Sequence, residues 1–241
     1  MSGRGERTTN EGRIGLPRAE QRRYLARIVG VFPSLILRTY CRIRLLIIGP
    51  RFLNVIAQYL PERGDVLEIG CGFGLSALYL SGLRPDLVLH GYDLDSERVS
   101  AAQAAAAALE RFNARFEVGD AARLTLERGF DAAYAIDLIH HVPKQFVPAF
   151  LEAVHERLQP GGRFVIKDVD DSPAYKRWVS WITDRVMVGF DEPIYYWPVK
   201  ELTAALSKAG FTVQVRSLPD LLPYPHVLYV CERPFPSIPG G

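Results

Sequence analysis

The feature that most constrains the fold is the segment Val66–Gly74, which reads VLEIGCGFG. An apolar run ends in three alternating glycines, and a helical pattern follows directly. Glycines allow a tight turn and a close approach of a ligand to the backbone, while the start of a helix offers unbonded N–H groups. The segment therefore predicts a buried strand, a glycine loop and a helix that together hold a nucleotide-like ligand.

After Gly64 short apolar strands alternate with helical stretches. Helices of this length between strands are typical of βαβ units and a mainly parallel sheet. The expected helices are 75–81, 96–111 (with Ser96 as N-cap), 145–158 and 199–209. The expected strands are 65–69, 87–92, 115–118, 130–135, 163–167, 211–217 and 226–232. The pattern predicts an α/β fold with a doubly wound, seven-stranded, mainly parallel sheet and an N-terminal helical extension.

The charges are distributed unevenly along the chain. Its 241 residues carry a formal net charge of +2, and 48% of them are hydrophobic, which suits one soluble globular domain. Residues 1–64 hold twelve arginines and four acidic residues, a net charge of +8, so residues 65–241 carry −6. A basic front end on an acidic body is a clue to partners rather than to the fold.

The basic front end divides into two parts. We expect residues 1–20 to form a flexible basic tail, residues 21–61 a helical extension or lid, and residues 62–241 the catalytic domain. The most apolar piece, Leu35–Ile48, is too short for a membrane span of about 20 residues and carries three arginines. Three cysteines without CxxC spacing indicate a reducing compartment, and the start of the chain lacks a signal peptide's apolar stretch. We expect a cytoplasmic protein.

A second motif follows the next expected strand. Asp93, in the sequence GYDLD, lies where an acidic side chain can accept hydrogen bonds from both ribose hydroxyls of a nucleotide. Enzymes that bind NAD and enzymes that bind S-adenosylmethionine (SAM) share this feature. The dinucleotide fingerprint GxGxxG would need glycine at position 75, where this chain has Leu75.

Four segments, in order and at matching spacing, make the chain resemble a class I SAM-dependent methyltransferase. They are VLEIGCGFG, GYDLD, the Gly119-Asp120 pair and LQPGGRFVI, and the resemblance runs from about Asp65 to Lys167. It implies a Rossmann-like methyltransferase fold, SAM as cofactor and S-adenosylhomocysteine as product. Two alternatives stay open, namely an NAD(P)-dependent oxidoreductase of Rossmann type and a non-catalytic module that binds SAM.

The resemblance also implies which residues contact SAM. Those expected at the methionine end are Glu68, Gly70, Cys71, Gly72, Gly74 and Asp137. Those expected at the ribose and the adenine are Asp93, Leu94, Asp120 and Ala121. Glu68 has a structural alternative, a carboxylate that bonds backbone N–H groups, and Asp137 could equally serve as a helix cap or a surface residue.

The expected exit of the fourth strand carries two histidines, His140 and His141. A neutral imidazole can accept a proton near pH 7, so either residue is a candidate base for an acceptor hydroxyl. The alternative is that the pair packs or caps. The histidines lack metal-ligand spacing, and we expect no metal.

Residues 169–198 interrupt the alternation and are rich in aromatic side chains. We expect this stretch to cover the acceptor as a lid, with Tyr175, Trp178, Tyr195 and Tyr196 as candidate substrate-binding residues; the alternative is that about half of its aromatics belong to the core. The expected acceptor is a small lipophilic or aromatic molecule methylated on oxygen or carbon. The fourth-strand exit lacks the Asn/Asp-Pro-Pro-Tyr pattern of nucleobase methylases, so nucleic acid is not expected. The extension could cover the acceptor, form a homodimer, or rest on the inner, anionic face of a membrane.

Overall fold

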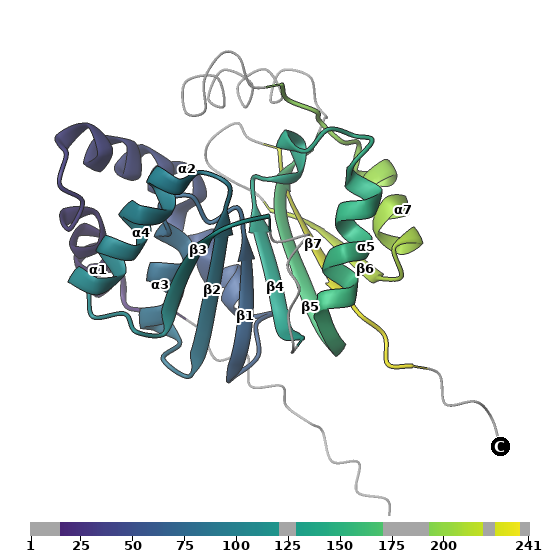
Figure 1. The fold of residues 1–241 in the computed structure, drawn as a ribbon, viewed down its shortest axis with the longest axis horizontal. Helices are drawn as coiled ribbons and strands as arrows, with labels where there is room; N and C mark the ends of the chain where they lie inside the picture. Colours follow the sequence, from purple (N-terminus) through teal and green to yellow (C-terminus); the bar gives the residue numbers. More distant parts are fainter. Residues whose placement is uncertain (1–14, 121–128, 171–192, 219–224, 237–241) are drawn as a thin grey trace, which may run out of the picture.

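A seven-stranded sheet with helices on both faces forms the described part of the chain (Figure 1). The computed structural model describes residues 15–120, 129–170, 193–218 and 225–236. The strands are β1 (Gly64–Ile69), β2 (Leu87–Asp93), β3 (Ala114–Val118), β4 (Phe130–Ile136), β5 (Leu158–Val169), β6 (Thr212–Ser217) and β7 (His226–Glu232). The helices are α1 (Arg18–Gly30), α2 (Leu35–Ala57), α3 (Leu75–Leu83), α4 (Ser96–Ala108), the 3₁₀ turn η1 (Ile139–His141), α5 (Val147–Arg157) and α7 (Val199–Lys208).

The strand order is β3-β2-β1-β4-β5-β7-β6. Strands β1 to β5 run parallel, and β7 lies antiparallel between β5 and β6. The order reverses between β1 and β4, and in such sheets ligands bind outside the carboxyl ends of the strands at this switch point. The predicted fold class is confirmed, and the topology directs attention to the exits of β1, β2 and β4.

Alternating residues of the central strands feed two separate layers of core. Val66 packs with side chains from α1, α2, α3 and α4, whereas Leu67 packs with side chains from α5 and α7. Successive side chains of a strand point to opposite faces, so a strand covered on both sides must be apolar throughout. In β1 the side chains of Val66, Leu67 and Ile69 are all buried, as the central place of the strand requires, and Glu68 is an acidic residue buried among them.

The predicted end and the predicted N-cap of helix α4 were wrong, for identifiable reasons. Helix α4 ends at Ala108 rather than at Arg111, because Glu110 adopts a positive φ of 54° and the Arg111 amide turns back to the carbonyl of Ala106 at 2.9 Å. This is the geometry of a Schellman ending, with Glu110 in the position usually given to glycine. At the other end the N-cap is Asp95, which accepts from two backbone amides, and Ser96 is the first helical residue.

Strand β5 begins earlier than expected. Leu158 already pairs with Phe130, and the pairing shifts register before Ala132 meets Arg163. The Pro-Gly-Gly turn, with Gly161 at a φ of 82°, therefore lies inside one long irregular strand. The preceding helix is shorter than predicted as a result, spanning 147–157 rather than 145–158.

The N-terminal extension is joined to the sheet domain by a polar network. The Gln21 side chain donates to the Tyr79 hydroxyl at 2.8 Å, which donates to the Asn54 side chain at 2.8 Å. The Tyr24 hydroxyl donates to the carbonyl of Leu78 at 2.6 Å. Both α1 and α2 thus contact α3 on one side of the sheet.

Helix α2 consists of two helical segments joined at Gly49, whose φ of 49° breaks the helix before Pro50. Proline suits the first turn of a helix, where its missing N–H costs nothing. Across the described part of the chain we find no helix with both the length and the apolar character needed to cross a bilayer.

Candidate cofactor and acceptor site

The glycine loop lies at the exit of β1, between that strand and α3. Gly72, with a φ of 51°, faces open space, so that a side chain there would meet no neighbouring atom. Gly74, with a φ of 72°, is different, because a Cβ atom would lie 2.6 Å from the ring of Phe116. The loop thus needs glycine at 74 for packing against β3, while at 72 it leaves the main chain open to a ligand.

Asp93, at the exit of β2, fixes the loop from the neighbouring strand. One of its carboxylate oxygens accepts from the Gly72 amide at 2.7 Å and the other from the Asp95 amide at 3.0 Å. Each carboxylate oxygen can accept more than one hydrogen bond, so the expected ribose contacts remain compatible with this arrangement. Leu94 follows and is 76% exposed, which leaves its side chain free to cover a flat ring.

Two other expected cofactor residues lie beyond β3. Asp120 lies at the strand exit and has an interaction partner in the structure. Ala121 lies outside the described residues. Cys71 is buried in the loop, and burial raises the pKa of its thiol, so this side chain stays neutral.

Glu68 is buried in β1 just before the loop. Its carboxyl accepts a short hydrogen bond from the Ser76 hydroxyl in the first turn of α3. Burial raises the pKa of Glu68 from 4.5 to about 8, although hydrogen bonds with Ser76 and Tyr134 act in the opposite direction. Glu68 therefore carries a proton at neutral pH in this structure, and a nearby cation would favour its ionised form.

Asp137, at the exit of β4, is held between two cations from distant parts of the chain. Its oxygens lie 2.5 Å from the Lys167 ammonium of β5 and 3.0 Å from the Arg44 guanidinium of α2. Burial alone would raise the pKa of Asp137, but the charges of Lys167 and Arg44 outweigh it and hold that pKa below its ordinary value. Asp137 has a φ of 51°, which is rare for residues other than glycine, and aspartate is among the residues that tolerate it.

His140 and Asp168 form a buried pair beside this ion-pair group. The Nδ1 atom of His140 is hydrogen-bonded to Asp168, whose carboxylate also accepts from the backbone amides of Ile139 at 3.0 Å and Val169 at 2.8 Å. An ionised carboxylate can only accept hydrogen bonds, so the Nδ1–H group of His140 is the donor. Asp168 thereby fixes the tautomer and the orientation of the imidazole.

His141 has a different environment. Its ring centroid lies 4.2 Å from that of His140. Burial, aided by the neighbouring His140, lowers the pKa of His141 from 6.5 to about 4. His141 is therefore neutral but a weak base at pH 7, which makes His140 the better candidate for proton transfer.

The end of the aromatic insertion contacts the histidine pair. The Tyr195 amide donates to the carbonyl of His140 at 2.7 Å, and the Tyr196 ring stacks on the His140 ring with centroids 6.0 Å apart. Asp170 and Trp197 form a parallel bridge, so the two ends of the insertion meet. Tyr175 and Trp178 lie outside the described residues.

The extension forms one wall of this region. Tyr40 and Phe32 pack edge-on against Phe73 of the glycine loop, with centroids 5.2 and 6.3 Å away. Farther along α2, the centroid of the Phe52 ring lies 4.7 Å from the centroid of the His226 ring and 5.6 Å from the Lys167 ammonium nitrogen. The loop and the strand exits are therefore both in contact with α2.

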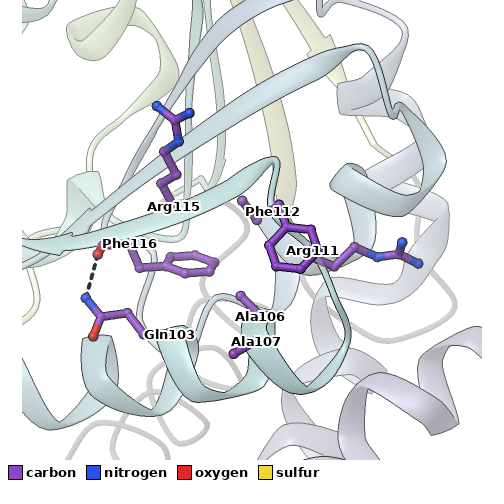
Figure 2. Close-up of a pocket in the computed structure, with 8 residues that line it drawn as sticks. Gln103, Ala106, Ala107, Arg111, Phe112, Arg115 and Phe116 are labelled. Carbon is purple, nitrogen blue, oxygen red and sulfur yellow. Dashed lines mark hydrogen bonds between the residues drawn. The ribbon is translucent and has the colours of Figure 1, made fainter.

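A surface hollow elsewhere in the described part of the chain is separate from this site. About 270 Å³ in volume, it opens between α4 and β3 (Figure 2). It is lined by Gln103, Ala106, Ala107, Arg111, Phe112, Ala114, Arg115 and Phe116. Ala114 begins β3 and Ala107 lies in the last turn of α4, so the hollow lies at the amino end of the parallel strands, away from their exits.

Several residues of the site escaped the sequence analysis. They are Arg44, Phe52, Lys167, Asp168 and His226. Lys167 and Asp168 left a usable signal, because a charged pair at the end of a fully buried strand needs partners. Arg44, by contrast, is one of several arginines in α2, and its sequence context does not separate it from the others. Within the described ranges no group of three or more side chains is arranged to hold a metal ion.

Comparisons with known proteins agree with this geometry. A family model described as a methyltransferase domain matches residues 38–215. The chain is 29% identical, over 69% of its length and 59% of the relative's, to O-methyltransferase cnsE of Penicillium expansum. It is 34% identical, over 54% of its length and 46% of the relative's, to fatty-acid O-methyltransferase of Mycolicibacterium smegmatis. The chain thus spans about half of the length of these curated relatives.

A solved structure gives the same fold. The crystal structure of a SAM-dependent methyltransferase from Methanosarcina mazei aligns with a TM-score of 0.61 at 20% identity, over 76% of this chain and 98% of that chain. Identity at this level shows the shared fold alone. The family match, however, begins at residue 38 inside α2, so most of that helix belongs to the region shared with relatives.

Proposed function

The chain belongs to the methyltransferase-domain family, as its resemblance to class I SAM-dependent methyltransferases suggested, and we propose that it methylates a small lipophilic or aromatic acceptor. The methyl donor is SAM, and the receiving atom is an oxygen or a carbon. The observation that carries the proposal is the open glycine loop, tied to Asp93, at the topological switch point of the sheet.

The residues at the loop fit SAM by their chemistry. Gly72 leaves the main chain open, Asp93 offers acceptors for ribose hydroxyls, and exposed Leu94 offers a surface for the adenine. Glu68 would lie near the cationic methionine end and lose its proton there. When bound, SAM supplies a sulfonium methyl group that is already activated, so the protein's main tasks are positioning and exclusion of water.

For a hydroxyl acceptor, His140 serves as the base. Its Nδ1–H is held by Asp168, so Nε2 would receive the proton that leaves the acceptor oxygen as the methyl group passes from the sulfonium, which becomes a neutral thioether, to that oxygen. Asp168 stabilises the imidazolium that results and does not itself take the proton. For a carboxylate acceptor, the oxygen is already ionised and this step is unnecessary.

The acceptor's lipophilic character is supported by two observations. The Tyr196 ring stacks on the His140 ring, which supplies an aromatic surface at the strand exits, and the adjacent Tyr195 is fixed there through its backbone amide. A relative named fatty-acid O-methyltransferase matches about half of the chain. We extend the proposal to a location on the inner face of a membrane, where such an acceptor would be dissolved, and leave a homodimer as the competing use of the extension.

The SAM site is tested by titration calorimetry with the Asp93→Ala variant. Loss of two hydrogen bonds to a charged group should weaken SAM binding by about a hundredfold. Asp86→Ala is the matched control, because Asp86 is exposed at the opposite end of β2 and should bind SAM normally. Unchanged affinity in Asp93→Ala would overturn the cofactor assignment, and binding of NADH in place of SAM would revive the oxidoreductase.

The base is tested by single-turnover methylation of long-chain fatty acids and phenols with labelled SAM. Asp168→Asn should slow methylation of a phenol by roughly 10²-fold or more, leave SAM affinity unchanged and alter the pH profile. Methylation of a fatty acid should be little affected, since its carboxylate needs no base. Normal SAM binding with no transfer to either class of acceptor would favour the non-catalytic module.

A further inference from the structure

The first half of α2 presents an apolar face to solvent. Leu35, Ile36, Ile43 and Leu46 are 74%, 84%, 40% and 74% exposed. At 3.6 residues per turn these four side chains fall within an arc of about 100° around the helix. We call them the outer face of α2.

The opposite side of the same helix is well packed. Cys41 and Ile48 are buried in the core that α2 shares with α3. The exposed side chains are therefore held in place by a fixed helix. Soluble proteins rarely expose a contiguous group of large aliphatic side chains on one helix without a partner for it.

The charges of the N-terminal extension indicate the kind of partner. Between residues 18 and 57 the chain has eight arginines and a single acidic residue, Glu20. The exposed arginines of this stretch are Arg18, Arg22, Arg23 and Arg27 on α1 and Arg42 and Arg51 on α2. Exposed aliphatic side chains on an arginine-rich extension match the boundary between anionic headgroups and acyl chains, because such an extension can bury apolar area and neutralise phosphate charge together.

We infer that the outer face of α2 docks on the surface of an anionic bilayer. Leu35, Ile36, Ile43 and Leu46 enter the interface between headgroups and acyl chains, and the arginines contact lipid phosphates. Arg44, on the same helix, reaches Asp137 at the exit of β4. If the proposed function holds, the docked bilayer lies beside the acceptor end of the site and supplies a lipophilic substrate directly.

The test is co-sedimentation of the full chain with vesicles, without SAM or acceptor. Binding is expected to vesicles of phosphatidylglycerol mixed with phosphatidylcholine, and it should weaken as salt is raised. The double variant Ile36→Ser, Leu46→Ser removes apolar area from the outer face and should lower the partition coefficient by at least about tenfold. Phe112→Ser is the matched control, since Phe112 is 82% exposed at the far end of α4 and should bind as the wild type does.

Three results would overturn the inference. They are equal binding to pure phosphatidylcholine, an unchanged partition of the double variant, and a wild-type dimer in light scattering that the double variant abolishes while neither protein binds vesicles. Calorimetry of SAM binding is run on each variant as a check of folding. Vesicle binding without any SAM binding would leave the docking face standing and reject the proposed function instead.

Discussion

The cofactor end and the acceptor end of the site are built in opposite ways. At the cofactor end, Asp93 binds amides of its own motif and of the adjacent loop, and Glu68 is neutralised by a proton. Where the expected methionine end of SAM meets the acceptor end, Asp137 is neutralised by side chains from α2 and β5, 93 and 30 positions away. One end depends on short motifs, and the other on the assembled fold.

The difference concerns what each end must do. A cofactor shared by many enzymes can be held by backbone groups, whose positions depend little on side-chain identity. The acceptor end instead depends on ion pairs between elements that are far apart in the chain. We therefore expect substitutions at the acceptor end to alter the stability of the fold, and those at the cofactor end to alter protonation and ligand affinity.

The largest expected effect is from Lys167→Met. Lys167 has no exposed area, and its loss leaves Asp137 buried with only the partly exposed Arg44 as counter-charge. Breaking a buried ion pair on one side should lower the free energy of unfolding by about 3–5 kcal/mol. Urea denaturation at neutral pH measures this change.

The matched control for Lys167 is the double variant Asp137→Asn, Lys167→Met. It removes the orphaned charge and should recover at least half of the lost stability. The wild-type ion pair should also weaken in acid, because the lowered pKa of Asp137 means that its contribution is lost as pH falls below the ordinary range of aspartate. A double variant no more stable than the single one would mean that packing, rather than charge, dominates at Lys167.

Glu68→Gln should have an intermediate effect, seen in the pH dependence of stability. Because the pKa of Glu68 is about 8 in the folded state and 4.5 as a free side chain, the folded state holds an extra proton between these values. The free energy of unfolding should therefore decrease as pH rises through this window, with a slope approaching about 1.4 kcal/mol per pH unit. Glu68→Gln should lack that slope.

The measurement for Glu68 is best made between pH 6.5 and 8. His141, whose pKa is lowered from 6.5 to about 4, contributes a slope of the opposite sign that is largest between these two pKa values and fades above pH 6.5, and this contribution is common to the wild type and Glu68→Gln. Equal slopes in wild type and Glu68→Gln over this range would show that Glu68 is already ionised without a ligand.

The smallest expected effect is from Arg44→Ala. The Arg44 side chain is 22% exposed, and Lys167 continues to pair with Asp137 in its absence. We expect a loss of about 1 kcal/mol in the free energy of unfolding, with Arg42→Ala, an exposed neighbour on α2, close to wild type. If Arg44→Ala lowered the free energy of unfolding as much as Lys167→Met, the buried and the partly exposed counter-ion of Asp137 would be equally important for stability.

The sequence was sufficient for the fold and for the place of the glycine loop between β1 and α3, and insufficient for the side-chain pairs at the exit of β4. Strand and helix periodicity predicted the sheet, because buried parallel strands must be apolar throughout. Residues such as Asp93 lie within a few positions of a strand end, so local pattern places them. The pairing of Arg44 with Asp137 depends on how α2 lies across the sheet, which no local pattern records. The end of α4 was predicted too late because the left-handed residue of a Schellman motif is usually glycine, and here it is Glu110.

The bridge between Asp170 and Trp197 has a consequence for how such an enzyme can change. Because the two ends of the intervening stretch meet, its length can vary without moving β5, α7 or the histidine pair. Because the Asp170–Trp197 bridge already holds the two ends together, lengthening the stretch between them costs little additional loop-closure entropy. The region between these two residues is a natural point for exchanging segments among relatives, so substrate range could be transplanted while the methyl-donor site remains intact.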